Sequence, residues 1–210
     1  MTAALTLYAD AGWESPWAFH ALVALEELRL KYTLEQLPLP IPIDKKALLA
    51  RKALLGKVPC LVHGELWLTE SSAISEYLTE QFPAQPSLYP ADAVERARAR
   101  QVMSWLRTGL MNLREERPTR SVFQRPVTAP LTTNAKHDLD DLVSVTEALL
   151  KPGATSLFAT WSIADADLAL ALMRGVANSD PMPQAVIDYA MAQWSRTSIR
   201  KYLAYIPTSH

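Results

Sequence analysis

The sequence predicts an α/β domain with a mixed four-stranded sheet, followed by an all-helical domain. Strand-type and helix-type patterns alternate over residues 1–82. Prolines then recur within residues 83–91, which is typical of a linker. Over residues 92–210 the apolar positions recur at helical spacing. We therefore expect two domains, 1–82 and 92–210, joined by this linker.

The composition is that of an ordinary folded chain. Of the 210 residues, 49% are hydrophobic and 20% are charged, a balance that disordered chains lack. A chain of this length buries roughly 70% of its unfolded surface, so its core needs neither a disulfide nor a metal. The net charge is −1 and no basic stripe stands out, so nucleic acid is not an expected partner.

Targeting signals are not apparent. Residues 1–4 lack a basic region followed by a long apolar stretch. No run approaches the roughly 18 apolar residues that a membrane-spanning helix needs. The single cysteine, Cys60, cannot form an intramolecular disulfide. We expect a cytoplasmic protein that does not cross a membrane.

The first elements expected are a strand and a helix. Leu5–Tyr8 alternates between apolar and polar residues, as a short strand does. Ser15 and Pro16 are residue types that favour the N-cap and the first position of a helix. The run from Trp17 to Leu28 then has apolar residues at helical spacing.

A second strand, a second helix and a hairpin follow. Residues 32–37 form the strand, and the prolines over 38–42 then keep the chain extended. A short helix over 44–55 ends at Gly56. Two apolar runs around His63-Gly64 predict a β-hairpin over 58–68. A helix begins near Ser71 and completes the order strand-helix-strand-helix-strand-strand-helix.

The second half of the sequence predicts several helices, which are separated by helix-ending residues and by a Pro-containing loop over residues 118–131. Ser162 to Asp165 has the spacing of a capping box, before an almost wholly apolar helix that should be buried on most sides. The helices expected cover residues 93–117, 133–150, 162–173, 184–194 and 198–205.

Two motifs connect the first domain to a known family. They are Gly56-Lys57-Val58-Pro59-Cys60-Leu61 and Leu68-Thr69-Glu70-Ser71-Ser72-Ala73-Ile74, with twelve residues from Val58 to Glu70. Over nearly its full length the sequence resembles the cytosolic glutathione S-transferases, in particular bacterial serine-type members. The resemblance implies a thioredoxin-like first domain, a homodimer, and an enzyme of detoxification and oxidative stress with glutathione as co-substrate and no metal.

The resemblance also assigns glutathione-binding residues. Val58, before a cis proline, pairs with the cysteinyl backbone of glutathione; the alternative is an ordinary trans proline at a strand start. Ser71 begins a helix whose N-terminus attracts the γ-glutamyl carboxylate, and Glu70 receives the ammonium group; alternatively, both residues merely cap the helix. Lys57 meets the glycyl carboxylate as a point charge, or is a solvated loop lysine.

Ser15 is the candidate catalytic residue. A free thiol has a pKa of about 8.5, so only a small fraction is ionised at neutral pH. A hydroxyl that donates to the sulfur, together with a helix N-terminus, lowers this pKa. The Ser15-Pro16-Trp17 sequence resembles the Ser-Pro-aromatic motif of serine-type transferases. The alternative is that Ser15 acts only as an N-cap.

Residues for the second substrate are expected in the helical domain. Arg107 and Met111 are candidates for an acceptor pocket, where arginines at helical spacing would suit an anionic electrophile. Alternatively, these arginines are solvated or form ion pairs between subunits. Cys60 is expected to be a small buried residue. The scattered histidines lack the spacing of a zinc site.

The reaction expected is attack by the glutathione thiolate on a small electrophile, or on an organic hydroperoxide. Two alternatives stay open. One is a glutathione-dependent isomerase that uses the same site. The other is a non-catalytic interaction protein of the same fold.

Overall fold

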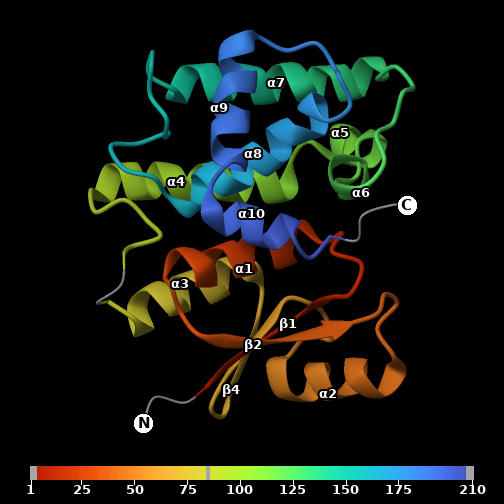
Figure 1. Cartoon of the computed structure of the whole chain (residues 1–210), viewed down its shortest axis with the longest axis vertical. Coiled ribbons are helices and arrows are strands. Elements are labelled where there is room, and N and C mark those ends of the chain that lie inside the picture. The colour runs from red at the N-terminus through yellow and green to blue at the C-terminus, as the bar shows by residue number, and fades with distance from the viewer. Residues whose placement is uncertain (1–3, 84–85, 207–210) are drawn as a thin grey trace. The chain divides into compact units, whose positions relative to one another are not determined.

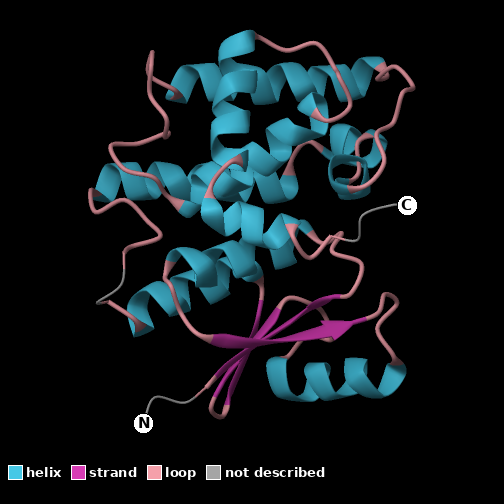
Figure 2. Cartoon of the chain, viewed as in Figure 1, coloured by secondary structure: helices cyan, strands magenta, loops and turns pink. Residues whose placement is uncertain are grey.

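The computed structural model describes residues 4–83 and 86–206. Residues 1–3, on which the expectation about targeting signals partly rests, and residues 84–85 of the expected linker lie outside this description. The chain divides into two compact units, Met1–Leu88 and Tyr89–His210. Among the described residues, strands occur only in the first unit (Figure 2). This arrangement confirms the predicted fold class.

The first unit is built on a four-stranded mixed sheet. Its strands are β1 (Leu5–Asp10), β2 (Tyr32–Leu37), β3 (Cys60–His63) and β4 (Leu66–Thr69), in the order β2-β1-β3-β4. β1 is parallel to β2 and antiparallel to β3, and β3 is antiparallel to β4. The parallel strands β1 and β2 need a crossover connection, which the helix between them supplies. The antiparallel strands β3 and β4 are joined directly by a hairpin turn.

Helices cover both faces of this sheet. Within the first unit, α1 (Pro16–Glu27) and α3 (Ser71–Gln81) pack together on one face, and α2 (Ile43–Ala53) lies on the other (Figure 1). α1 begins as the sequence predicts, because Ser15 is its N-cap and Pro16 its first residue. Residues 18–25 are all buried in the core. This burial holds the start of α1 firmly against the sheet.

α2 ends two residues before its expected end. Leu54 has a φ of 67°, which a helix cannot continue through. The chain then turns back over the helix at Gly56. A Cβ atom there would lie 2.7 Å from Lys46 Cγ and 2.9 Å from the Lys46 carbonyl oxygen. Only glycine fits this close approach without a shift.

The second unit is helical throughout its described part. Its helices are α4 (Ala93–Thr108), α5 (Met111–Glu116), α6 (Thr119–Phe123), α7 (Thr133–Leu149), α8 (Ile163–Val176), α9 (Gln184–Trp194) and α10 (Thr197–Leu203). α8 contacts α4, α6, α7 and α9. All of its residues from Ile163 to Gly175 are buried, as its apolar sequence predicts. The expected capping box is present at Ser162 and Asp165.

The prediction of one continuous helix over residues 93–117 is wrong. Gly109 caps α4, and its N–H donates to the Trp105 carbonyl oxygen at 2.8 Å. Leu110 then adopts a left-handed conformation with a φ of 57°, so that α5 starts in a new direction. The expected loop 118–131 also contains the short α6, and α8 extends three residues beyond Met173.

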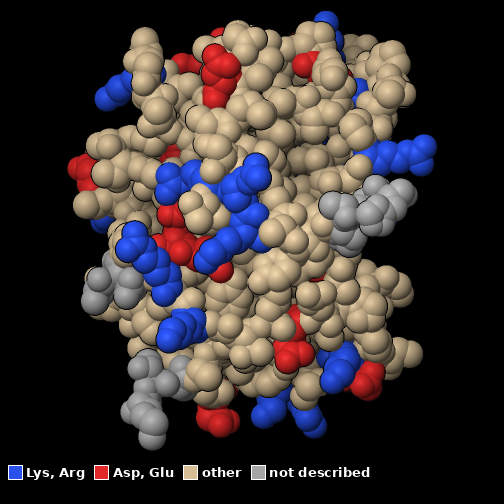
Figure 3. Space-filling view, in the orientation of Figure 1, with Lys and Arg blue, Asp and Glu red and all other residues tan. Residues whose placement is uncertain are grey.

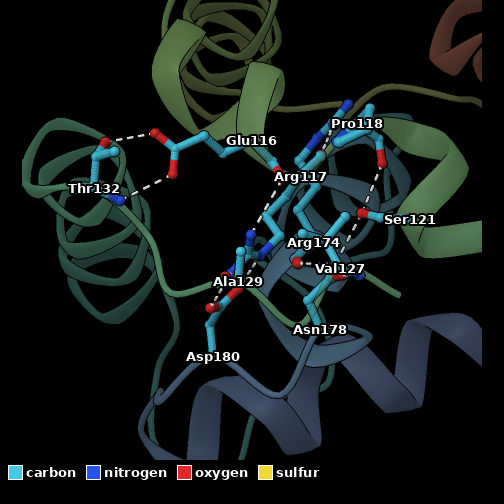
Figure 4. Close-up of polar contacts among 10 residues, drawn as sticks. All are labelled: Glu116, Arg117, Pro118, Ser121, Val127, Ala129, Thr132, Arg174, Asn178 and Asp180. Carbon is cyan, nitrogen blue, oxygen red and sulfur yellow. Dashed lines mark hydrogen bonds and ion pairs between the residues drawn. The ribbon is translucent and has the colours of Figure 1, made fainter. Parts of the chain in front are cut away.

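A buried ion pair holds the end of α5 in the second unit (Figure 4). The Arg117 guanidinium donates to both carboxylate oxygens of Asp180, at 2.7 and 2.8 Å, and to the Ala129 carbonyl oxygen at 2.8 Å. Its side chain is only 2% exposed. These hydrogen bonds to Asp180 raise the pKa of Arg117. Arg174 of α8 donates in turn to the Arg117 carbonyl oxygen.

The surface carries charges of both signs. On the face drawn in Figure 3, basic and acidic side chains lie beside one another. No helix within residues 4–83 and 86–206 is long and apolar enough to cross a membrane.

Candidate functional site

The loop that carries Ser15, the start of β3 and the start of α3 all lie at one end of the sheet. Tyr8 pairs with Cys60, and Cys60 pairs with Thr69. The end of β1, the residues before β3 and the residues after β4 are therefore neighbours. The N-termini of α1 and α3 point to the same end, since α1 follows β1 and α3 follows β4. Two helix N-termini beside the residues before β3, where strand pairing has not yet begun, are suited to an anionic peptide.

Ser15 has a hydroxyl whose proton is available to a ligand. Its Oγ accepts a hydrogen bond from the Ala18 N–H at 3.3 Å, which uses an oxygen lone pair and leaves the O–H as a donor. The side chain is half-buried. Its backbone N–H donates to Asp10 Oδ2 at 3.3 Å. Ser15 therefore acts as the expected N-cap and still has a donor to offer.

Val58 presents an unpaired stretch of backbone. The Val58–Pro59 bond is cis, as the resemblance implies. Within the described part of the chain, the Val58 N–H and C=O groups make no hydrogen bond, because β3 pairs only from Cys60 onward. The Val58 side chain packs against a buried cluster that includes Leu49 and Cys60. The side chain thus anchors a backbone that is free to pair with an extended peptide.

Glu70 and Ser71 form the start of α3. Glu70 has a φ of 68°, which non-glycine residues rarely adopt. Its carboxylate is exposed and makes no ion pair or hydrogen bond with the described residues. Ser71 is buried at the first position of the helix. A positive group on a ligand can contact the Glu70 carboxylate, while a carboxylate of the same ligand contacts the N–H groups at the start of α3.

Lys57 completes this edge. Its side chain is exposed, between the close approach at Gly56 and the open backbone of Val58. Its ammonium is available to a carboxylate in solution.

Comparisons with known proteins decide the family. A model of the glutathione S-transferase C-terminal domain matches residues 92–207, more than half of the chain, and a model of the N-terminal domain matches residues 14–81. The chain belongs to the glutathione S-transferase family. Its first unit has the thioredoxin-like fold expected of the family, and the subclass stays a prediction.

Relatives of this chain are found among curated proteins and solved structures. Glutathione S-transferase U13 of Arabidopsis thaliana is 38% identical over 88 residues, which cover 42% of this chain and 39% of that protein. The chain thus aligns with well under half the length of this curated relative. A glutathione transferase homologue from Burkholderia gl BGR1, solved with bound glutathione, is 33% identical, with a TM-score of 0.77 and 96% of both chains covered. A glutathione S-transferase from Rhodospirillum rubrum is 26% identical, with a TM-score of 0.71, over 94% of this chain and 91% of that chain.

The residues expected to meet the second substrate lie on either side of the break between α4 and α5. Arg107 donates to Asp167 at 2.8 Å and to the Met103 carbonyl oxygen at 2.9 Å. This ion pair joins α4 to α8 within one chain. Met111 is 59% exposed, and its sulfur lies 3.6 Å from the Arg114 guanidinium. Met111 therefore offers an accessible apolar surface, whereas the charge of Arg107 is largely neutralised.

Two buried polar residues of the first unit were not predicted from the sequence. Asp10 is fully buried at the end of β1 and binds the loop before Ser15. His20 is also fully buried, and its Nε2 lies 2.9 Å from Ser75 Oγ, which joins α1 to α3. The only sequence signal for Asp10 was a carboxylate directly after an apolar strand. His20 gave no signal, because a histidine in an apolar run has no fixed meaning.

Cys60 is buried, as expected. Burial raises the pKa of the Cys60 thiol to about 11, since a charged thiolate is disfavoured in an apolar core. Among the described residues no group of three or more histidine, cysteine, aspartate or glutamate side chains is placed to hold a metal ion.

Proposed function

We propose that this chain is a glutathione transferase that binds glutathione at the sheet end formed by Ser15, Val58 and Glu70. The observation that carries the proposal is the convergence there of a hydroxyl donor, an unpaired backbone edge and an exposed carboxylate. The homologue from Burkholderia gl BGR1, which was solved with bound glutathione, supports the same ligand.

Each part of glutathione has a proposed partner. The N–H and C=O groups of Val58 pair with the cysteinyl backbone, as one strand pairs with another. The γ-glutamyl carboxylate lies at the N-terminus of α3, at Ser71, and its ammonium faces Glu70. Lys57 meets the glycyl carboxylate. The first unit thus provides the whole glutathione site, and residues 1–82 are assigned to it.

Ser15 activates the thiol in this proposal. Its hydroxyl donates to the sulfur, and the N-terminus of α1 adds a positive potential. A fall of about two units in the thiol pKa, roughly 2.7 kcal/mol, makes the thiolate dominant at neutral pH. Catalysis then consists of positioning and electrostatic stabilisation.

The thiolate reacts with small electrophiles. Its sulfur lone pair forms a carbon–sulfur bond, and the leaving group departs with the bonding electron pair. With an organic hydroperoxide, the thiolate attacks the terminal oxygen, which yields the sulfenic acid of glutathione and an alkoxide that takes up a proton. A second glutathione then forms the disulfide and releases water.

The helical unit, residues 92–210, is assigned to the second substrate. We place its apolar part near Met111, which is accessible, with Arg107 fixed by Asp167 beside it. A cytoplasmic homodimer, as is typical of the family, completes the proposal.

Glutathione binding and turnover test this function together. Calorimetry with glutathione, and turnover with chlorodinitrobenzene and cumene hydroperoxide, are measured for the wild type, Ser15→Ala and Glu70→Ala. Ser15→Ala should keep glutathione affinity but lose kcat by about 100-fold, comparable to removing one oxyanion donor. Glu70→Ala should lose affinity by at least about 10-fold, as expected for a charged hydrogen bond.

Glu65→Ala is the matched control for Glu70→Ala, because Glu65 is an exposed carboxylate in the hairpin of the same unit. It should behave as the wild type. Failure of the wild type to bind glutathione, or full turnover by Ser15→Ala, would refute the proposed site.

A further inference from the structure

Asp10 binds the backbone that leads into Ser15. Its Oδ2 accepts hydrogen bonds from the Glu14 N–H at 2.6 Å and from the Ser15 N–H at 3.3 Å. Its backbone carbonyl oxygen accepts the Trp13 N–H at 3.2 Å. One residue at the end of β1 therefore fixes most of the loop between the sheet and α1.

This loop contains a strained residue. Trp13 has a φ of 54°, a conformation that costs free energy for a bulky side chain. Its side chain is only 2% exposed, so it cannot relax into solvent. Hydrogen bonds on both sides of Trp13, to the backbone and the carboxylate of Asp10, keep the loop in this conformation.

The Asp10 carboxylate is an unfavourable choice for stability alone. Asp10 is fully buried, and its Oδ1 has no hydrogen-bond partner among the described residues. A buried polar oxygen without a partner costs free energy that a smaller or apolar residue would avoid. The presence of Asp10 is better explained by the loop backbone that its other oxygen, Oδ2, holds in place.

Asp10 and Ala18 fix Ser15 from two sides. The carboxylate of Asp10 holds the backbone N–H of Ser15, and the Ala18 N–H holds its Oγ. With both groups held, the hydroxyl has one defined position. Since misplacement of a reacting group by about 1 Å can cost about 100-fold in rate, this double constraint matters for thiol activation.

We propose that Asp10 is a positioning residue, which holds the Ser15 hydroxyl where it stabilises the glutathione thiolate. This inference rests on the proposed function. Asp10 itself touches neither glutathione nor the second substrate, and it acts only through Ser15.

The test combines a double-mutant cycle with titration of the bound thiol. The pKa of bound glutathione is followed by the ultraviolet absorbance of the thiolate in the wild type, Asp10→Ala, Ser15→Ala and the double variant. Asp10→Ala should raise this pKa and lower kcat by about 10-fold or more, with the KM for glutathione changed by less than about threefold. In the Ser15→Ala background, Asp10→Ala should have no further effect on either quantity.

Two other variants at this position sharpen the result. Asp10→Asn keeps a carbonyl oxygen for the two N–H groups, so kcat should return to within about threefold of the wild type. If Asp10→Ala does not fold, Asp10→Ser replaces it, with the same expected rise in thiol pKa.

Asp92→Ala is the matched control. The Asp92 carboxylate also accepts two backbone N–H groups, those of Val94 and Glu95, both at 2.9 Å, at the start of α4. Its loss should lower the melting temperature and leave the thiol pKa unchanged.

The outcomes separate the two proposals. If Ser15→Ala retains the thiolate and full turnover, the proposed catalytic role of Ser15 fails, and the role of Asp10 falls with it. If Ser15→Ala loses both but Asp10→Ala keeps the wild-type thiol pKa, only the role of Asp10 is overturned. An equal loss from Asp10→Ala with and without Ser15 also overturns it.

Discussion

Glu70 occupies a backbone conformation that costs the protein free energy. Its φ of 68° and ψ of 111° are unfavourable for a residue with a Cβ atom, by about 1–2 kcal/mol. Its exposed carboxylate gains no hydrogen bond or ion pair from the described residues in return. The proposed ligand supplies this missing partner through its ammonium group.

Glu70→Gly should therefore separate stability from binding. Glycine adopts a positive φ without strain, so the free energy of unfolding should rise by about 1 kcal/mol. Glutathione affinity should fall as it does for Glu70→Ala, which keeps the strain. Urea denaturation and calorimetry on both variants test this prediction. A glycine variant that is less stable than the alanine variant would contradict it.

Cys60 should be protected from alkylation in the folded protein. Because burial raises its thiol pKa to about 11, the reactive thiolate is scarce below about pH 9, and the reaction should accelerate as pH rises toward 11. The folded state favours the protonated thiol. The stabilisation that the protonated Cys60 thiol gives the folded state is therefore complete below about pH 8.5, the pKa of a free thiol. It is lost as pH rises through about 11.

The single cysteine makes this measurement unambiguous. Iodoacetamide incorporation, followed by mass spectrometry at pH 8, should be slow in buffer and fast in urea. Cys60→Ala should incorporate none and should keep glutathione-dependent turnover. Rapid labelling of the folded protein at pH 8 would show that the thiol is neither buried nor protonated.

At the scale of elements, the sequence correctly predicts the helices and strands that are bounded by clear caps and turns. The Ser15-Pro16 start of α1 and the capping box of α8 are confirmed. The predicted hairpin is present, but its turn is formed by residues 64–65, because His63 still belongs to β3 and pairs with Leu66. These features depend on a few adjacent residues, so local chemistry determines them.

Tertiary contacts explain what the sequence did not show. Gly109 lies inside the helix predicted over 93–117, yet it caps α4, where Leu110 adopts a left-handed conformation and buries its side chain. In the site, motif spacing indicated Val58 and Glu70, and the Val58–Pro59 bond is cis, as the resemblance implies. Asp10 and the His20–Ser75 contact depend on partners distant in sequence or in an irregular loop, so no local pattern revealed them.

The Arg117–Asp180 pair should be essential to the stability of the second unit. Asp180→Ala leaves a buried guanidinium without its carboxylate, and we expect a loss of about 3–5 kcal/mol in the free energy of unfolding. Asp188→Ala is the control. Asp188 is an exposed carboxylate on α9 that accepts only from Gln184, and its loss should change stability by less than about 0.5 kcal/mol. Urea denaturation, monitored by circular dichroism, compares the stabilities of the two variants. Equal stabilities would contradict the prediction.

At the scale of the whole molecule, we propose separate roles for the two units. The first unit contains every residue assigned to glutathione, at one end of its sheet. The second unit is organised around the buried α8, which forms an ion pair with α4, while Asp180 in the loop after α8 pairs with Arg117 at the end of α5. Substitutions that weaken the second unit should therefore change its stability without removing the glutathione contacts of the first.

A crystal structure with glutathione tests the central claim most directly. It should show the cysteinyl backbone paired with the N–H and C=O groups of Val58, the γ-glutamyl carboxylate at the start of α3, and the sulfur within about 3.5 Å of Ser15 Oγ. Glutathione bound elsewhere, or with its sulfur turned away from Ser15, would contradict the account.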